Sequence, residues 1–135
     1  MAFSEQLEFA YFEGGIVPFT EANISIGTHV VQYGTGAFAG IRGYLSADGN
    51  AINIVRLQDH CTRLLRSAKL LRMDLALDRD SMAQAIIDVT KKNAPKTDVY
   101  YRPFVYKASV ELTPRLMNLK DEFACYMLPM GDYLD

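Results

Sequence analysis

Hydrophobic residues in the middle of the chain recur at helical spacing, which predicts two helices. The first is expected over 57–73, where apolar residues three or four positions apart form one continuous stripe. That stripe consists of Leu57, Cys61, Leu64, Leu65, Ala68 and Leu71. The second helix is expected over 79–93, with a stripe of Met82, Ala85, Ile86 and Val89.

Polar residues mark the ends of the second helix. Asp78 or Ser81 is expected to cap its N-terminus, and the pair Ser81 and Gln84 fits a capping box. Asn93 and Pro95 are expected to end it.

The segment before the helices predicts two hairpins. Residues 7–19 form the first, with its turn at Gly14-Gly15, and Pro18 places the returning strand at a sheet edge. A strand over 37–45 and a shorter one over 51–55, joined by a turn, form the second.

After the helices, β-branched and aromatic residues predict strands over 98–109 and 121–130, with a loop over 112–120. Strands, then two helices, then strands indicate an α+β fold: a mostly antiparallel sheet with two main helices packed on one face. Residues 1–135 are expected to form a single small domain.

Composition narrows the function classes. The net charge of -2 gives no general attraction to nucleic acid or to an anionic membrane, so neither is an expected partner. No apolar run is long enough for a membrane span, and a cytoplasmic location is expected. The two cysteines, Cys61 and Cys125, lie far apart without metal-ligand spacing and are expected to be reduced core thiols.

One flank of the first helix gathers groups that could bind a phosphate. At about 100° per residue, Arg56, His60, Arg63 and Ser67 lie on one side of the apolar stripe. Guanidinium groups match phosphate oxygens with charge-assisted hydrogen bonds. A solvated basic edge of an amphipathic helix explains the same spacing, and from the residues alone that alternative stays open.

Tyr100 and Arg102 lie two residues apart on a predicted strand and therefore share one face of the sheet. A phenol beside a guanidinium suits the recognition of a carboxylate. A solvent-facing pair on a half-exposed sheet is the alternative.

The run from Gln32 to Tyr44 contains Gly34, Gly36, Gly40 and Gly43 but no dinucleotide or P-loop fingerprint. The glycines are expected to let another backbone approach a strand. On their own, Tyr33 and Phe38 are more simply explained as core aromatics.

Taken together, these motifs resemble the N-terminal half of a branched-chain-amino-acid aminotransferase, an enzyme of fold type IV that uses pyridoxal 5'-phosphate (PLP). The resemblance rests on the Gln32–Tyr44 run, His60-x-x-Arg63-Leu64, Tyr100-x-Arg102-Pro103 and the stretch from Pro129 to Leu134.

The resemblance implies a role for each motif. Arg63 binds the PLP phosphate, Phe38 lines the pocket for an apolar side chain, and Tyr33 reaches the active site of a neighbouring subunit. Tyr100 binds the α-carboxylate of the substrate, and Arg102 binds the distal carboxylate of glutamate or 2-oxoglutarate. Tyr133 lies near the distal group of the substrate.

The resemblance also implies amino transfer between leucine, isoleucine or valine and 2-oxoglutarate by a homo-oligomeric enzyme. No lysine of this chain matches the position of the family's PLP-binding lysine, which lies in a C-terminal domain. The chain is therefore expected to contain no catalytic residue, to need that domain as a partner, to be inactive alone and to bind PLP weakly. Lys107 is the one lysine to test as a substitute nucleophile.

Three rival interpretations remain. D-amino-acid aminotransferase and aminodeoxychorismate lyase share the His-x-x-Arg-Leu helix. The chain could instead be a non-enzymatic module that dimerises through exposed apolar surface, or an α+β domain without a site.

Overall fold

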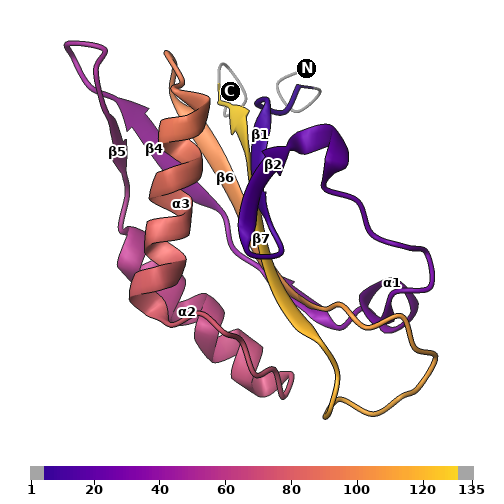
Figure 1. The fold of residues 1–135 in the computed structure, drawn as a ribbon. Coiled ribbons are helices and arrows are strands. Elements are labelled where there is room, and N and C mark those ends of the chain that lie inside the picture. The colour runs from indigo at the N-terminus through magenta and orange to yellow at the C-terminus, as the bar shows by residue number, and fades with distance from the viewer. Residues whose placement is uncertain (1–4, 131–135) are drawn as a thin grey trace.

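The computed structural model describes residues 5–130, which form an antiparallel sheet covered on one face by helices (Figure 1). The sheet has seven strands in the order β2-β1-β7-β6-β4-β5, and β3 pairs with β6 beside β4. Every pairing between the strands is antiparallel. The α+β fold class expected from the element order is therefore confirmed.

The first hairpin joins β1 (Phe9–Phe12) to β2 (Gly15–Pro18), and β2 lies at the sheet edge as Pro18 indicated. The turn is one residue earlier than expected. Glu13 and Gly14 occupy it with positive φ angles of 47° and 91°, whereas Gly15 already pairs with Phe12. Two consecutive positive φ angles are typical of the tight turn that matches the twist of a hairpin. A short 3₁₀ helix, η1 (Phe19–Glu21), follows β2.

The single strand expected over 37–45 is two strands, β3 (Gly36–Phe38) and β4 (Ile41–Leu45). Both pair with β6 (Val99–Lys107) in one continuous register. Opposite the break, Pro103 accepts a hydrogen bond from the Ala39 N–H at 3.0 Å but has no N–H to donate in return. The missing donor explains why the ladder is interrupted there.

The second hairpin is completed by β5 (Ile52–Ile54), which pairs with β4 and forms the other edge of the sheet. On the far side of β6, β7 (Asp121–Pro129) pairs with it along its whole length. β6 and β7 each begin and end within two residues of the bounds expected from the sequence.

The two main helices are α2 (Leu57–Leu70) and α3 (Arg79–Asn93). Asp78 is the N-cap of α3, and its partner in the capping box is Ser81, not the predicted Ser81–Gln84 pair. The Asp78 carboxylate accepts from the Ser81 N–H at 2.8 Å, and the Ser81 hydroxyl accepts from the Asp78 N–H at 2.9 Å.

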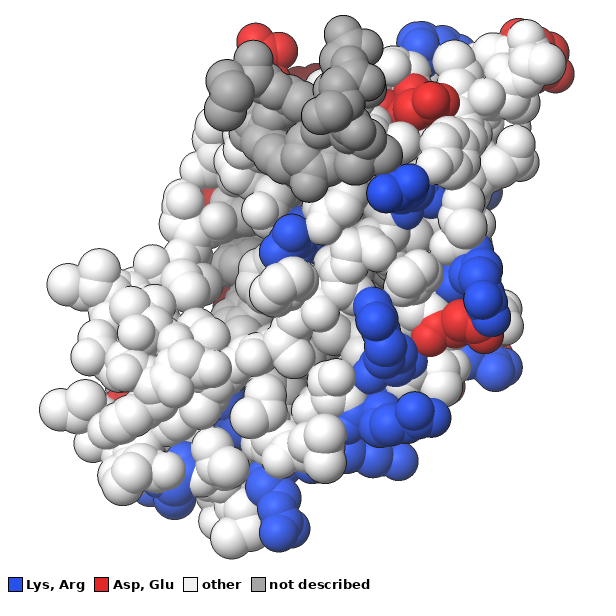
Figure 2. Space-filling model, turned by 180° about the vertical axis from the view of Figure 1, so that it is seen from behind, with Lys and Arg blue, Asp and Glu red and all other residues white. Residues whose placement is uncertain are grey.

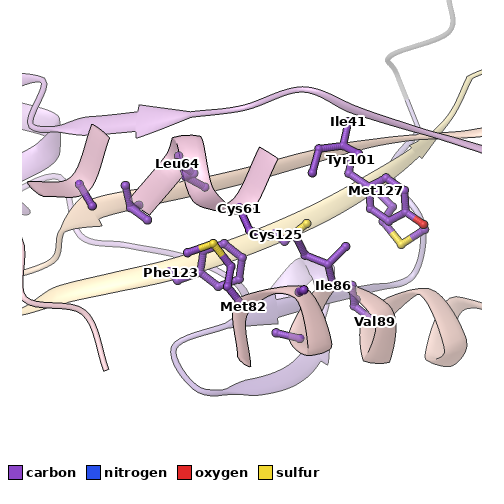
Figure 3. Packing of buried hydrophobic residues seen from close by; sticks show 14 of the residues in the cluster. Ile41, Cys61, Leu64, Met82, Ile86, Val89, Tyr101, Phe123, Cys125 and Met127 are labelled. Carbon is purple, nitrogen blue, oxygen red and sulfur yellow. The ribbon is translucent and has the colours of Figure 1, made fainter. Parts of the chain in front are cut away.

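The core lies between these helices and the sheet (Figure 3). Cys61 and Leu64 of α2 and Met82, Ile86 and Val89 of α3 are almost completely buried. They pack against Tyr101, Phe123, Cys125 and Met127 of the central strands. Both cysteines are free, and burial raises the pKa of the Cys61 thiol to about 11 and that of the Cys125 thiol as well.

The short helix α1 (His29–Tyr33) was not expected from the sequence. His29 is fully buried and anchors it. Its Nε2 donates to the Thr113 carbonyl at 2.6 Å, so its Nδ1 accepts from the Thr35 hydroxyl at 2.7 Å. The bond to Thr113 ties α1 to the loop after β6, and the bond to Thr35 ties it to the start of β3.

The end of α3 holds the N-terminal hairpin. The Asn93 side chain accepts from the Phe9 N–H at 2.9 Å and donates to the Phe9 carbonyl at 3.0 Å. One side-chain amide thereby replaces a neighbouring strand at this position of β1.

A buried ion pair fastens the connection between the helices to the sheet. Lys107 is 0% exposed, and its ammonium donates to Asp121 Oδ1 at 2.9 Å and to the Arg72 carbonyl at 3.0 Å. The other oxygen of Asp121 accepts from the Asp74 N–H at 2.8 Å. Because the ammonium is fully enclosed and paired, Lys107 is a structural residue and has no opening to a ligand.

Removing one partner of this pair should destabilise the protein strongly. We expect Lys107→Met to lower the free energy of unfolding by about 3–5 kcal/mol, because it leaves the Asp121 carboxylate buried without its counter-charge. The double variant Lys107→Met/Asp121→Asn should lose less, since the amide oxygen still accepts from Asp74. Exposed Lys69→Met is the control and should change stability by no more than about 0.5 kcal/mol. Urea unfolding measures all three, and equal losses in the single and double variants would contradict the account.

Candidate functional site

Three side chains meet on the face of the sheet that the helices leave open. Tyr100 and Arg102 of β6 point away from the core, whereas their neighbour Tyr101 is buried and bonds to Thr90 of α3. Phe38 pairs with Phe104 in the register of β3 and β6, and therefore shares the open face. The predicted common face of Tyr100 and Arg102 is confirmed.

The Arg102 guanidinium contacts both rings. Its central carbon lies 4.1 Å from the centroid of the Phe38 ring and 5.5 Å from that of the Tyr100 ring. Its Nη2 also donates to the Tyr100 hydroxyl at 2.9 Å. Stacking and a hydrogen bond together fix the plane of the guanidinium, which prepares it to receive a planar anion.

One donor of this guanidinium is buried without a partner. Arg102 Nε is buried and has no hydrogen-bond partner within residues 5–130. A buried donor without a partner costs free energy. The side chain as a whole is half-buried, and its other N–H groups suit a carboxylate. Phe38 beside it is 64% exposed and offers an apolar surface, so the cluster can bind a carboxylate and an apolar side chain next to each other.

Gly40 makes room for the Tyr100 hydroxyl. A Cβ atom at this position would overlap the Tyr100 Oη, and its next nearest atom would be Tyr100 Cζ at 3.1 Å. The sequence predicted that these glycines admit another backbone, and this is confirmed at Gly36, where a Cβ would lie 3.1 Å from the Val105 carbonyl oxygen. At Gly40 the approaching group is a phenol, and at Gly43 the nearest atoms are side-chain atoms of Ile52, Tyr101 and Val99.

Arg63 and His60 lie on the flank of α2 beside its buried stripe. Arg63 is exposed and forms no ion pair with any carboxylate in residues 5–130. Arg56 is exposed as well and is paired with Asp59 at 2.7 Å. Viewed from behind, basic side chains gather along the right-hand edge of the molecule, on the side where β5 and α2 lie (Figure 2).

The pKa of His60 is lowered on this flank. Burial lowers the pKa of the imidazole, and the positive charges of Arg63 and Arg56 lower it further, with Asp59 opposing. Its Nδ1 is buried and has no hydrogen-bond partner among the described residues.

The structure brings Phe38, Tyr100 and Arg102 together but does not bring every predicted residue to them. Arg63 belongs to α2, which packs on the opposite face of the sheet and contacts β3, the strand that carries Phe38. Tyr33 ends α1, is 42% exposed and packs on the His29 ring with 4.7 Å between centroids. Tyr133 lies outside the described residues.

The interpretation of Phe38 and Tyr33 as core aromatics is wrong, since both are exposed.

No helix in residues 5–130 is long and apolar enough to span a membrane. The same residues contain no group of three or more His, Cys, Asp or Glu side chains placed to hold a metal ion.

Comparison with known proteins places these features in context. Residues 36–131 match the family described as amino-transferase class IV. Over 129 residues the chain is 44% identical to a probable branched-chain-amino-acid aminotransferase of Synechocystis, covering 95% of this chain and 42% of that protein. The chain thus spans about two fifths of the length of the curated relatives that it matches.

Solved structures of branched-chain aminotransferases are also similar to this chain. The branched-chain aminotransferase of Thermoproteus uzoniensis with norvaline superposes with a TM-score of 0.88 at 30% identity, over 97% of this chain and 43% of that one. The branched-chain amino acid aminotransferase of Thermobaculum terrenum in its PLP form superposes with a TM-score of 0.82 at 29% identity. That match covers 93% of this chain and 41% of that one.

Filling the space at Gly40 should disturb the cluster. We expect Gly40→Ala to displace the Tyr100 ring, to break its hydrogen bond with Arg102 and to cost about 1–3 kcal/mol of stability. Gly15→Ala is the matched control, because a Cβ there meets nothing within 4 Å and the change should cost less than about 1 kcal/mol. Urea unfolding and the NMR shifts of the Arg102 guanidinium test this. Unchanged shifts in Gly40→Ala would refute the contact.

The His60 pKa should respond to its arginine neighbour. We expect the folded protein to show a His60 pKa below 6.5, and Arg63→Gln to raise it without fully restoring the ordinary value, because burial remains the largest cause. Since folding opposes protonation of His60, its contribution to stability is present above pH 6.5 and declines as the pH falls below that value. NMR titration of the imidazole measures this. Arg66→Gln is the control, and an equal rise in that variant would contradict the assignment.

Proposed function

Because this chain belongs to the class IV aminotransferase family, we propose that it forms the substrate-recognising wall of a PLP-dependent branched-chain aminotransferase. The activity proposed for the complete enzyme is amino transfer between leucine, isoleucine or valine and 2-oxoglutarate. The observation that carries the proposal is the half-buried Arg102 guanidinium, stacked on Phe38 and bonded to Tyr100.

The cluster has the chemistry that both substrates require. Tyr100 and Arg102 would bind carboxylates, with Tyr100 at the α-carboxylate and Arg102 at the distal carboxylate of glutamate or 2-oxoglutarate. Phe38 would pack on the aliphatic side chain of a branched substrate. Tyr33 would act in the site of a neighbouring copy, and Tyr133 would lie near the distal group of the substrate.

The donors on α2 fit a phosphate. Arg63 is exposed and unpaired within residues 5–130, and His60 three residues earlier has a buried nitrogen without a partner. We propose that Arg63 binds the phosphate of PLP, since its planar guanidinium matches phosphate oxygens. PLP, when bound, supplies the electron-withdrawing ring needed to move an amino group between an amino acid and a 2-oxo acid.

The proposed contribution of this chain is binding and orientation. Lys107 is fully enclosed by Asp121 and the Arg72 carbonyl, so it is a poor substitute for a PLP-binding lysine. We propose no catalytic residue in this chain, no turnover by the chain alone and weak PLP affinity at best. The lysine would come from a further domain.

A second candidate is a dimerising role without catalysis. Exposed apolar side chains gather on α1 with the segment before it and on the loop after β6, the two segments that His29 ties together. They are Ile24, Ile26, Val31, Tyr33, Val110, Leu112 and Met117. Such a surface favours contact with another protein, and a second copy of this chain is the proposed partner.

A chimera tests the proposed activity. The chain would replace the matching segment of the Synechocystis relative, with which it shares 44% identity. We expect the chimera to transaminate leucine, isoleucine and valine with 2-oxoglutarate. Arg63→Gln should weaken PLP binding about tenfold or more, and Arg102→Gln should raise KM for 2-oxoglutarate by a similar factor, because each removes charge-assisted hydrogen bonds.

Arg66→Gln in the chimera is the control, and it should leave both constants unchanged. Turnover of D-alanine in place of the branched L-amino acids would favour the D-amino-acid aminotransferase alternative. A folded chimera without any transaminase activity would favour the dimerising role.

A further inference from the structure

A groove unrelated to the candidate site lies at the β5 edge of the sheet. It is bounded by β5, the start of α2 and the C-terminal half of α3, and its volume is about 700 Å³. That volume is within the range of small-molecule sites. None of its lining residues belongs to the Phe38, Tyr100 and Arg102 cluster or to the basic flank of α2.

The inner wall of the groove is aliphatic. Ile52, Ile54, Leu57 and Ile87 line it and are each half-buried. Thr90 also lines it, but its hydroxyl already forms two hydrogen bonds: it donates to the Ile86 carbonyl at 2.7 Å and accepts from the Tyr101 hydroxyl at 2.9 Å. The wall therefore favours a hydrocarbon chain and has no free polar group at Thr90 to satisfy.

The outer part of the groove is positively charged. Lys91 and Lys96 are exposed lining residues, and within residues 5–130 neither forms an ion pair with a carboxylate. Lys96 donates only to the Gly49 carbonyl at 3.3 Å. No lining residue is acidic. The C-terminal end of α3 carries about half a negative elementary charge, which two ammonium groups outweigh.

An aliphatic wall below two uncompensated cations matches one class of ligand. We propose that the groove binds an aliphatic carboxylate of medium chain length, such as a free fatty acid. The hydrocarbon chain packs on Ile52, Ile54, Leu57 and Ile87, and the carboxylate lies between the ammonium groups of Lys91 and Lys96. Binding here is separate from the proposed aminotransferase function and does not depend on it.

Titration of the 135-residue chain with decanoate, below its micelle concentration, tests the proposal. We expect saturable binding of one equivalent by calorimetry, with NMR shifts at the methyl groups of Ile52, Ile54, Leu57 and Ile87. Lys91→Gln/Lys96→Gln should raise Kd about fivefold, as expected for two solvent-exposed ion pairs. Lys69→Gln, which changes an exposed lysine outside the groove, should leave Kd unchanged.

Two comparisons make the test decisive. Decyltrimethylammonium carries a similar hydrocarbon chain with the opposite charge and should bind at least about fivefold more weakly than decanoate. Ile87→Glu places a carboxylate on the wall and should abolish decanoate binding, while circular dichroism shows whether that variant is folded. Equal binding of the two amphiphiles, or shifts at Phe38 and Arg102 in place of the groove methyl groups, would overturn the proposal.

Discussion

Successive side chains of β6 point to opposite faces of the sheet, and both the core and the candidate site depend on this alternation. Tyr101, Val105 and Lys107 point toward the helices and are fully buried. Tyr100 and Arg102 point the other way and build the open-face cluster. A shift of one residue in the register of β6 would exchange these sets and place a guanidinium in the core. The dense packing of the helix face therefore also fixes the position of the binding groups.

Hydrophobic patterns that continue over many residues predicted most of the fold. The stripe of Met82, Ala85, Ile86 and Val89 predicted α3, since a helix of four turns repeats its pattern often enough to be recognised, and the polar residues at its ends gave both bounds correctly. α1 was missed because five residues contain little more than one turn and its stability comes from tertiary bonds of His29. The break between β3 and β4 was missed because its cause, Pro103, lies on a different strand.

The candidate site was predictable in part. Spacing alone placed Tyr100 and Arg102 on one face, since two residues is the repeat of a strand. The stacking of Phe38 under Arg102 required knowledge of which strands pair, and that information is not local in the sequence. The same is true of Gly40, whose importance depends on a phenol sixty residues away. Arg63 remains a prediction from family resemblance and helix geometry, because its guanidinium contacts none of the cluster residues that the structure describes.

The bond between Asn93 and Phe9 has a consequence for how the domain opens. Local unfolding proceeds in cooperative units, and the boundaries of those units follow the contacts that must break together. Because the last turn of α3 supplies both hydrogen bonds to the Phe9 backbone, fraying of that turn leaves this residue of β1 without those partners, and detachment of β1 exposes the amide of Asn93. We therefore expect amides at the start of the N-terminal hairpin and at the end of α3 to exchange together, although more than eighty residues separate them along the chain.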